Sequence, residues 1–271
     1  KSHRLGFIKF LCERGLSVII CTDCKDASES EIESLKKKNI KLIDLKLGRS
    51  SIGILKNLYS LIQLNKIILQ YKPKKLSLVS AKPIVVGGLL SLVHRFEKVY
   101  FSITGLGYVF INQSFKARSI RIILLAIYRL VFLKKNCHVI FQNKDDLNLF
   151  LSKKIVTLSK STIISGNGID TENFKQERKS SDKVRFLFAS RLLVDKGINE
   201  FFKASEAIGG DKASFKIVGE LDKENPNCIS NEFFRKIREN SLVSYIEKVE
   251  HEKIPQLLSS SDVFVLPSYR E

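Results

Sequence analysis

The stretch FASRLLVDKG, residues 188–197, joins a predicted strand to a predicted helix, and this connection indicates the fold that we expect from the sequence. Its apolar run predicts a strand ending near Ala189, the loop after it carries Arg191 and Lys196, and a helix opens near Gly197. Similar β-rich apolar runs alternate with helical stretches along the whole chain. This alternation is typical of βαβ units with parallel strands, so the sequence predicts an α/β protein.

The predicted strands fall into two blocks separated by the polar segment 170–183. We therefore predict two doubly wound domains, 1–165 and 166–271, of which the second is incomplete. The helix after the fifth strand is expected to have Asp145 or Asp146 as its N-cap. The predicted strands are 17–22, 41–46, 75–80, 99–104, 138–143 and 161–166 in the first block, and 184–190, 214–219, 243–249 and 262–266 in the second.

Charge is distributed very unevenly between the two blocks. Residues 1–160 contain 29 Lys and Arg against 10 Asp and Glu, a net charge of +19, whereas residues 161–271 contain 17 and 18, a net charge of −1. A basic first half indicates a polyanionic partner: anionic lipid, a lipid phosphate or nucleic acid. Because no zinc knuckle, RNP-type motif or helix-turn-helix accompanies it, we favour a membrane surface or lipid phosphate and expect no nucleic acid.

Other features of the composition narrow the class of protein. No apolar run is long enough to span a bilayer, and the longest candidate, 122–133, is interrupted by Arg129. The five cysteines are an odd number, and the lone pair Cys21 and Cys24 lacks the second pair that a structural zinc site needs. The segment 115–135 mixes cations with apolar residues; a membrane-docking helix is possible, but we favour a core helix with solvated ends.

The loops after the second-block strands carry the candidate site. Two cations, Arg191 and Lys196, beside a helix N-terminus form a good diphosphate site, although both can also be ordinary exposed cations. The stretch KIVGELDKENP, 216–226, places Gly219 where a backbone can approach a ligand, and the last strand is followed by Ser268 and Glu271. Because the carboxyl ends of parallel strands share one edge, we expect these residues to lie together.

In this order, strand-S-R-x4-K-G-helix, strand-V-G and strand-P-S-x-x-E, the motifs resemble glycosyltransferase family 4 over nearly the whole chain. These are retaining, nucleotide-sugar-dependent enzymes of the GT-B fold, in which two Rossmann-like domains face each other across a cleft. The stretches 216–226 and 265–271 resemble the branch that builds capsule, O-antigen and exopolysaccharide units on polyprenyl-diphosphate carriers. The resemblance implies transfer from a UDP-hexose or UDP-N-acetylhexosamine to a lipid-linked glycan precursor, by a cytoplasmic protein peripheral to the inner face of the cell membrane.

The resemblance also implies roles for single residues. Arg191, Lys196 and Glu271 are the implied catalytic residues, and together with Gly197, Gly219 and Ser268 they form the implied donor site. Glu271 matches the first glutamate of an E-x7-E element whose second glutamate falls after the last residue. Since the sequence also lacks methionine, we expect both ends to be cut and the isolated chain to have weak activity or none. The implied acceptor-side residues are Lys82, Thr104, Gly105 and Gly107.

Some features depart from the family pattern. The glycine-rich first loop would precede Lys1, and Thr104 stands where many relatives carry a histidine, so no catalytic histidine is assigned. The four histidines, at positions 3, 94, 138 and 251, fit structural or surface roles better. Such enzymes use the leaving phosphate to deprotonate the acceptor, and we expect no metal and no cofactor. The alternatives are a GT-B sugar-nucleotide epimerase and a non-catalytic remnant that binds nucleotide or lipid phosphate. An oxidoreductase is disfavoured because no G-x-G-x-x-G follows a strand.

Overall fold

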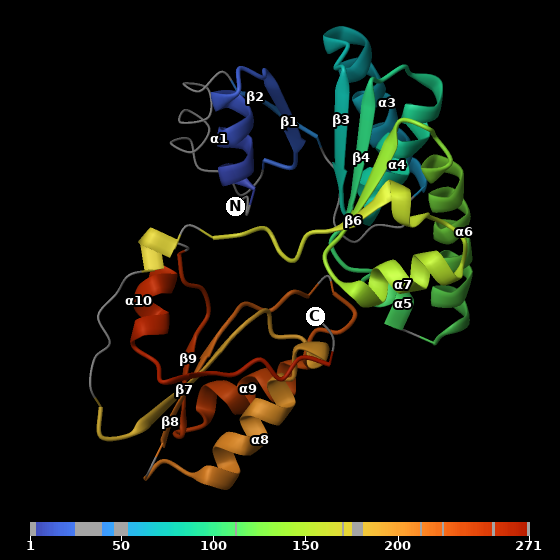
Figure 1. Ribbon diagram of the computed structural model, residues 1–271. Helices are drawn as coiled ribbons and strands as arrows, with labels where there is room; N and C mark the ends of the chain where they lie inside the picture. Colours follow the sequence, from blue (N-terminus) through green and yellow to red (C-terminus); the bar gives the residue numbers. More distant parts are fainter. Residues whose placement is uncertain are drawn as a thin grey trace. The chain divides into compact units, whose positions relative to one another are not determined.

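The computed structural model describes residues 4–24, 40–45, 54–111, 113–169, 171–174, 181–211, 213–223, 225–250 and 253–269. The chain divides into two compact units, Lys1–Ile169 and Asp170–Glu271 (Figure 1). This division falls a few residues after the predicted boundary at 165/166. Every pair of described strands is parallel, so the predicted α/β class is confirmed.

In the first unit, the described strands form two parallel sheets with orders β1-β2 and β3-β4-β5-β6. All six predicted strands are present, each within a few residues of its predicted bounds. The strands are β1 Val18–Thr22, β2 Ile40–Asp44, β3 Lys75–Val79, β4 Lys98–Ile103, β5 Cys137–Phe141 and β6 Ser161–Ile163. The helices are α1 Leu5–Glu13, α3 Ile54–Tyr71, α4 Ala81–Val93, α5 Tyr108–Ile111, α6 Phe115–Phe132 and α7 Lys144–Ser152, with a 3₁₀ turn at Leu158–Lys160.

An aromatic cluster joins the sheet of the first unit to its helices. Phe101 of β4 lies 4.9 Å from Phe132 of α6, and Phe141 of β5 lies 5.3 Å from Phe150 of α7, measured between ring centroids. Tyr128 of α6 contacts both Phe132 and Phe150, each at 5.6 Å. All five rings are buried. Such rings remove large apolar areas from water, so this cluster fixes α6 and α7 on the sheet.

The N-terminus of α7 differs from the prediction. Asn143, not Asp145 or Asp146, is the N-cap, and its Oδ1 accepts a hydrogen bond from the backbone N–H of Asp146 at 2.8 Å. The Asn143 side-chain amide in turn donates to the Asp146 carboxylate at 3.1 Å. The two acidic residues therefore occupy the first turn, where negative charge favours the helix dipole.

The second unit has one parallel sheet of order β10-β7-β8-β9. Leu187 and Phe188 of β7 are consecutive and point to opposite faces. Phe188 belongs to the core beneath α8 and α9, whereas Leu187 packs with Leu257 of α10. Helices therefore cover both faces, as doubly wound units require. The elements are a 3₁₀ turn Thr171–Phe174, β7 Val184–Ala189, a 3₁₀ turn Val194–Lys196, α8 Ile198–Ile208, β8 Ala213–Val218, α9 Asn231–Glu239, β9 Val243–Ile246, α10 Ile254–Ser259 and β10 Val263–Phe264.

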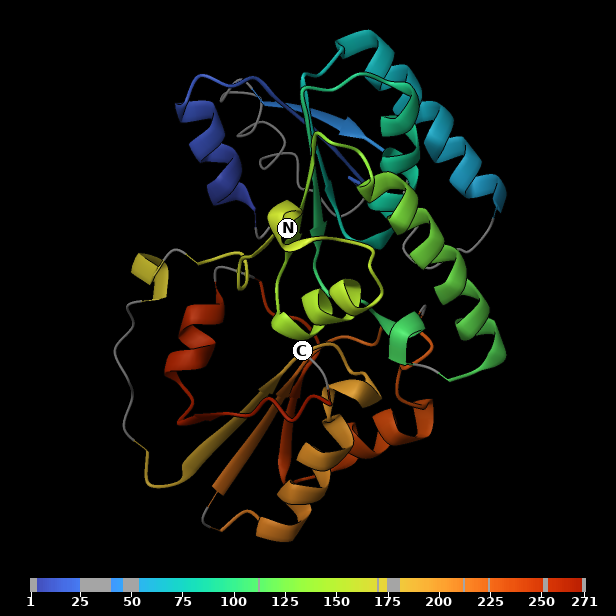
Figure 2. The same cartoon turned by 45° about the vertical axis from the view of Figure 1, so that its right-hand side comes forward.

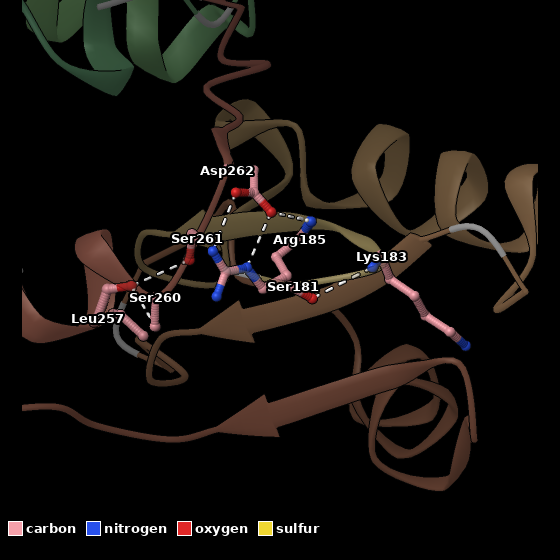
Figure 3. A network of polar contacts seen from close by, with 7 residues as sticks. All are labelled: Ser181, Lys183, Arg185, Leu257, Ser260, Ser261 and Asp262. Atoms are coloured by element: carbon pink, nitrogen blue, oxygen red, sulfur yellow. Dashed lines mark hydrogen bonds and ion pairs between the residues drawn. The ribbon is translucent and has the colours of Figure 1, made fainter. Parts of the chain in front are cut away.

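The short edge strand β10 is fixed at its amino end by an ion pair. Arg185 of β7 donates to the Asp262 carboxylate from its backbone N–H, from Nε and from Nη2, at 2.9, 2.9 and 3.1 Å (Figure 3). The backbone N–H of Asp262 donates back to the Arg185 carbonyl at 2.9 Å. These hydrogen bonds raise the pKa of Arg185. The pair closes the sheet edge opposite to the predicted site.

The cysteines form no disulfide: Cys12, Cys21, Cys24, Cys137 and Cys228 are all free thiols. In the parts of the chain that the structure describes, no group of three or more His, Cys, Asp and Glu side chains could hold a metal ion. None of the described helices combines the length and the apolar character needed to cross a lipid bilayer.

Candidate functional site

Three loops of the second unit meet at the carboxyl edge of its sheet. They follow β7, β8 and β10, and they carry residues 190–197, 219–230 and 265–269. In parallel α/β sheets this edge is where ligands bind, because the loops and the helix N-termini converge there. All three loops belong to the second unit.

The first two loops approach each other closely at Gly219. The backbone N–H of Ser190 donates to the Val218 carbonyl at 3.0 Å, and that of Leu192 donates to the Glu220 carbonyl at 3.2 Å. A Cβ atom at Gly219 would lie 1.8 Å from the Ser190 carbonyl oxygen, a separation that no side chain tolerates. Only glycine therefore allows the β7 and β8 loops to run side by side.

Arg191 is held by a carboxylate from the neighbouring loop. Its Nη1 lies 2.7 Å from Oδ2 of Asp222, and the two side chains are 54% and 30% exposed. This is a charge-assisted hydrogen bond, which orients the guanidinium at the surface of the loop cluster. Because the pair is largely open to water, the guanidinium can exchange this partner for another anion at small cost.

Gly197 joins the first loop to the third. It is the N-cap of α8 and has φ +76°, a conformation that favours glycine. A Cβ atom here would lie 2.2 Å from the Pro267 carbonyl oxygen, so the loop after β10 lies directly against the start of α8. Lys196 precedes Gly197 and closes the 3₁₀ turn, with its N–H donating to the Leu193 carbonyl at 3.1 Å.

Tyr269 fastens the third loop to α8. Its backbone N–H donates to the Asp195 carbonyl at 3.0 Å, and its hydroxyl donates to Oε1 of Glu200 at 2.6 Å. The hydroxyl hydrogen bond lowers the pKa of Glu200 and raises the pKa of Tyr269. The loop that leads towards Glu271 is therefore held in one position through Tyr269.

Two buried polar atoms in this cluster have no hydrogen-bond partner among the described residues. Oγ of Ser268 and Oδ1 of Asp195 are buried and make no hydrogen bond within the described part of the chain. A buried polar atom without a partner costs free energy, and such atoms are rare in folded proteins. Both atoms lie in the loops that bind each other through Tyr269, so the cluster offers hydrogen-bonding capacity to a ligand.

The arrangement favours an anion. By helix geometry the first amides of α8 have no carbonyl one turn earlier to donate to, and they carry the positive end of the helix dipole. Arg191 and Lys196 precede this N-terminus in the same loop. Phosphate groups are the ligands that such a combination binds most readily.

The other predicted site residues have different positions. Glu271 lies outside the described residues. Lys82, Thr104, Gly105 and Gly107 belong to the first unit, at the carboxyl ends of β3 and β4. Gly105 and Gly107 have φ of +118° and +68°, as expected for a tight turn. Nearby, Ser80 has φ +71° at the N-terminus of α4, a strained conformation for a residue other than glycine.

The sequence alone did not assign Asp222, Asp195, Tyr269 or Glu200 to the site. Each lies within or near a quoted motif, but a lone aspartate or tyrosine in a loop carries no specific pattern. Asp222 and Arg191 are 31 residues apart, and Glu200 and Tyr269 are 69 apart. Such long-range pairs become visible only when the loops are folded together.

Comparisons with known proteins agree with this geometry. Residues 169–271, which include the whole second unit, match the family model "Glycosyl transferases group 1". The chain is 28% identical over 286 aligned residues to N,N'-diacetylbacillosaminyl-diphospho-undecaprenol alpha-1,3-N-acetylgalactosaminyltransferase of Campylobacter jejuni, covering 99% of this chain and 71% of that protein.

Two solved structures are similar over almost the full chain. Sucrose-phosphate synthase of Thermosynechococcus elongatus has a TM-score of 0.71 at 18% identity, covering 97% of this chain and 68% of that one. HepE of Anabaena, in complex with UDP and glucose, has a TM-score of 0.67 at 15% identity, covering 99% and 71%. At these identities the structures establish the fold alone. Together with the family-model match, these similarities support a glycosyltransferase of the GT-B fold.

Proposed function

We propose that this chain is a retaining glycosyltransferase of family 4, in the capsule, O-antigen and exopolysaccharide branch. Its donor is a UDP-linked hexose or N-acetylhexosamine, and its acceptor is a lipid-linked glycan precursor. The name of the Campylobacter jejuni relative describes transfer to a diphospho-undecaprenol glycan, and HepE was solved with UDP and glucose. Both facts concern those proteins and support the same classes of donor and acceptor here.

The observation that carries this proposal is the loop cluster at the carboxyl edge of β7, β8 and β10. It combines Arg191 and Lys196 with the N-terminus of α8 and with the Ser268 hydroxyl, which is buried and makes no hydrogen bond to any described residue. A nucleotide-sugar diphosphate has anionic oxygens for the cations and the amides, and oxygen atoms that can accept from Ser268. The close approaches at Gly197 and Gly219 keep these groups in one place.

In the reaction, the bond between the anomeric carbon and the β-phosphate oxygen breaks, and a bond to the acceptor oxygen forms on the same face of the sugar. The acceptor proton passes to the leaving phosphate, and UDP is released. Arg191 and Lys196 stabilise the negative charge that grows on the diphosphate. Glu271 accepts hydrogen bonds from sugar hydroxyls and so positions the donor.

The first unit is the proposed acceptor side. It carries the net charge of +19, which favours a diphosphate-linked lipid and an anionic leaflet. Lys82 and the turn at Thr104, Gly105 and Gly107 lie at the carboxyl edge of its sheet, where the acceptor saccharide is expected. The protein would then work in the cytoplasm, peripheral to the inner face of the cell membrane.

We infer that no metal and no cofactor takes part, because the two cations and α8 can neutralise the diphosphate. Removing divalent metal with EDTA is therefore expected to change the transfer rate by less than about twofold. The rate would be measured before and after chelation, and again after magnesium is restored. A loss that magnesium reverses would contradict this part of the proposal.

The proposal is tested by incubating the protein at its full natural length with radiolabelled UDP-N-acetylgalactosamine, UDP-N-acetylglucosamine, UDP-glucose and GDP-mannose, each with a polyprenyl-diphosphate-linked saccharide. We expect labelled lipid product with one UDP-sugar, and UDP binding by calorimetry. Failure to bind or turn over any of these donors would refute it. Conversion of a UDP-sugar without acceptor would instead identify an epimerase, and UDP binding with neither reaction would identify a binding module.

A further inference from the structure

The helices of the first unit lie in an almost acid-free part of the chain. Residues 45–144 contain 17 Lys and Arg but a single acidic residue, Glu97. Helices α3, α4 and α6 all fall within this range and contain no Asp or Glu. A helix that faces water ordinarily carries charges of both signs on its outer side. The outer side of these helices therefore has an unusual composition.

Helix α6 exposes apolar side chains in a continuous row. Its buried residues, including Tyr128, Val131 and Phe132, pack on the core, yet the opposite side is also apolar. The exposed apolar residues are Phe115, at 85% exposure, Ile122, at 64%, Ile123, Leu130 and, just after the helix, Leu133. A core helix with solvated ends, as favoured from the sequence, is therefore an incomplete description of α6.

Cations flank the exposed row of α6, and a second helix also exposes apolar side chains. Arg118 and Arg129 of α6 are exposed beside the row. In α3 the residues Leu58, Ile62 and Leu69 are also exposed, together with Lys66. Both helices pack against α4, and the three lie on the same side of the β3–β6 sheet (Figures 1 and 2). We call the exposed apolar and basic residues of α3 and α6 the outer helix face.

We propose that the outer helix face docks on an anionic lipid bilayer. Side chains such as Ile122 and Leu130 would enter the headgroup–acyl boundary, while Arg118, Arg129 and Lys66 would contact lipid phosphates. Charge complementarity selects this occupant, since a surface with many cations and no carboxylate suits an anionic leaflet. The proposal deepens the proposed function, on which the need for a membrane rests, but the contact can be tested without any sugar transfer.

The test is co-sedimentation of the protein with phosphatidylcholine vesicles that contain or lack phosphatidylglycerol. We expect binding to the anionic vesicles, weaker binding to the neutral ones, and a loss of binding at high salt. Ile122→Glu is expected to lower the partition coefficient by about tenfold, because it removes an inserted side chain and adds a repelled charge.

The matched control is Ile208→Glu, the same change at a side chain of 52% exposure in the second unit. It should leave vesicle binding unchanged, and both variants should keep the wild-type melting temperature. Equal losses in the two variants, or no binding by the wild type, would overturn the proposal. So would a concentration-dependent dimer in sedimentation velocity that Ile122→Glu abolishes, because the face would then bind a second copy of the chain.

A second assay separates this proposal from the proposed function. On a short-chain acceptor that is soluble in water, Ile122→Glu should transfer sugar as fast as the wild type. Vesicle binding without any transferase activity would refute the proposed function but leave the docking surface standing. Transferase activity without vesicle binding would refute the docking surface but leave the proposed function standing.

Discussion

Two arginine–aspartate pairs lie at opposite edges of the same sheet, and they differ in geometry. At the amino edge, Arg185 donates three hydrogen bonds to the Asp262 carboxylate, and the two side chains are only 18% and 17% exposed. At the carboxyl edge, Arg191 and Asp222 share one contact of 2.7 Å, at 54% and 30% exposure. The residue types are identical, but one pair is closed and the other is open.

This difference separates a structural role from a binding role. The closed pair is largely shielded from water and connects β7 to the edge strand β10. A mostly buried pair of this kind is costly to break, because the remaining charge loses its partner. The open pair contributes little to stability, but it holds a guanidinium ready beside the N-terminus of α8.

The largest effect is expected for Arg191→Ala. Loss of one cation that stabilises charge on the leaving diphosphate should lower kcat/KM for the donor by about 100-fold to 1,000-fold. The melting temperature should stay within about 1 °C of the wild type, because the lost pair is open to water. Steady-state kinetics and calorimetry measure the two quantities. Arg235→Ala, at an exposed cation on α9, is the control and should retain full activity.

The next largest effect is expected where the loop after β10 contacts Gly197 at the start of α8. Gly197 and Gly166 have φ of +76° and +74°, but a Cβ atom at Gly197 would meet a neighbouring carbonyl, whereas nothing lies within 4 Å of a Cβ at Gly166. Gly166→Ala should lower the free energy of unfolding by about 1 kcal/mol, the cost of the backbone conformation alone. Gly197→Ala should cost about 3 kcal/mol and weaken UDP binding, since it displaces the loop after β10. Equal values in urea titrations would contradict a close contact at Pro267.

For the closed pair, Arg185→Ala should lower the melting temperature by about 5 °C, because Asp262 remains at the sheet edge without its main partner. Donor KM should not change, since the pair lies at the far edge of the sheet. Calorimetry and donor titration should therefore show lost stability with unchanged donor KM, whereas Arg191→Ala should show lost activity with unchanged stability. A variant that loses activity at wild-type stability would break the comparison between the two edges.

Local patterns were sufficient to predict most of the fold. The strand in 188–197 ends at Ala189 and the helix begins directly after Gly197, as expected, because β-rich runs and turn glycines act over a few residues. Helix starts were less certain: Asn143 and Asp146 are both good caps, and a single sequence does not decide between them. The sequence showed that α6 is rich in apolar residues. It could not show that some of them pack on the core while others, such as Ile122, are exposed to solvent.

The candidate site was predictable only in part. Arg191, Lys196, Gly197, Gly219 and Ser268 could be placed in one cluster, because the exit loops of parallel strands must share an edge. The partners that orient them could not be predicted. Asp222 and Glu200 are ordinary loop and helix carboxylates until the chain brings Arg191 and Tyr269 to them. Their roles depend on tertiary contacts that have no local signature.

The smallest effect is expected for Tyr269→Phe, which removes only the hydroxyl bond to Glu200. At pH 7 we expect donor KM to rise by about threefold or less, because the bond is exposed to water. Glu200 has a lowered pKa. Its stabilising hydrogen bond is therefore fully present above the ordinary glutamate pKa of about 4.3 and is lost as pH falls through the lower pKa of the folded state. Tyr269 has a raised pKa, so its contribution is present below about 10 and is lost as pH rises through the higher folded value.

In the wild type the Tyr269–Glu200 hydrogen bond should therefore persist throughout the neutral pH range. Donor KM should rise only at acid pH, where Glu200 is protonated, and at alkaline pH, where Tyr269 is deprotonated. In Tyr269→Phe the ratio of variant to wild-type KM should be constant near neutrality and approach one at both limits. Tyr71→Phe, which also removes one tyrosine hydroxyl but lies in the first unit, is the control. If the ratio changes steeply between pH 6 and 8, the Tyr269–Glu200 bond is not what holds the loop, and a group that titrates near neutrality positions it instead.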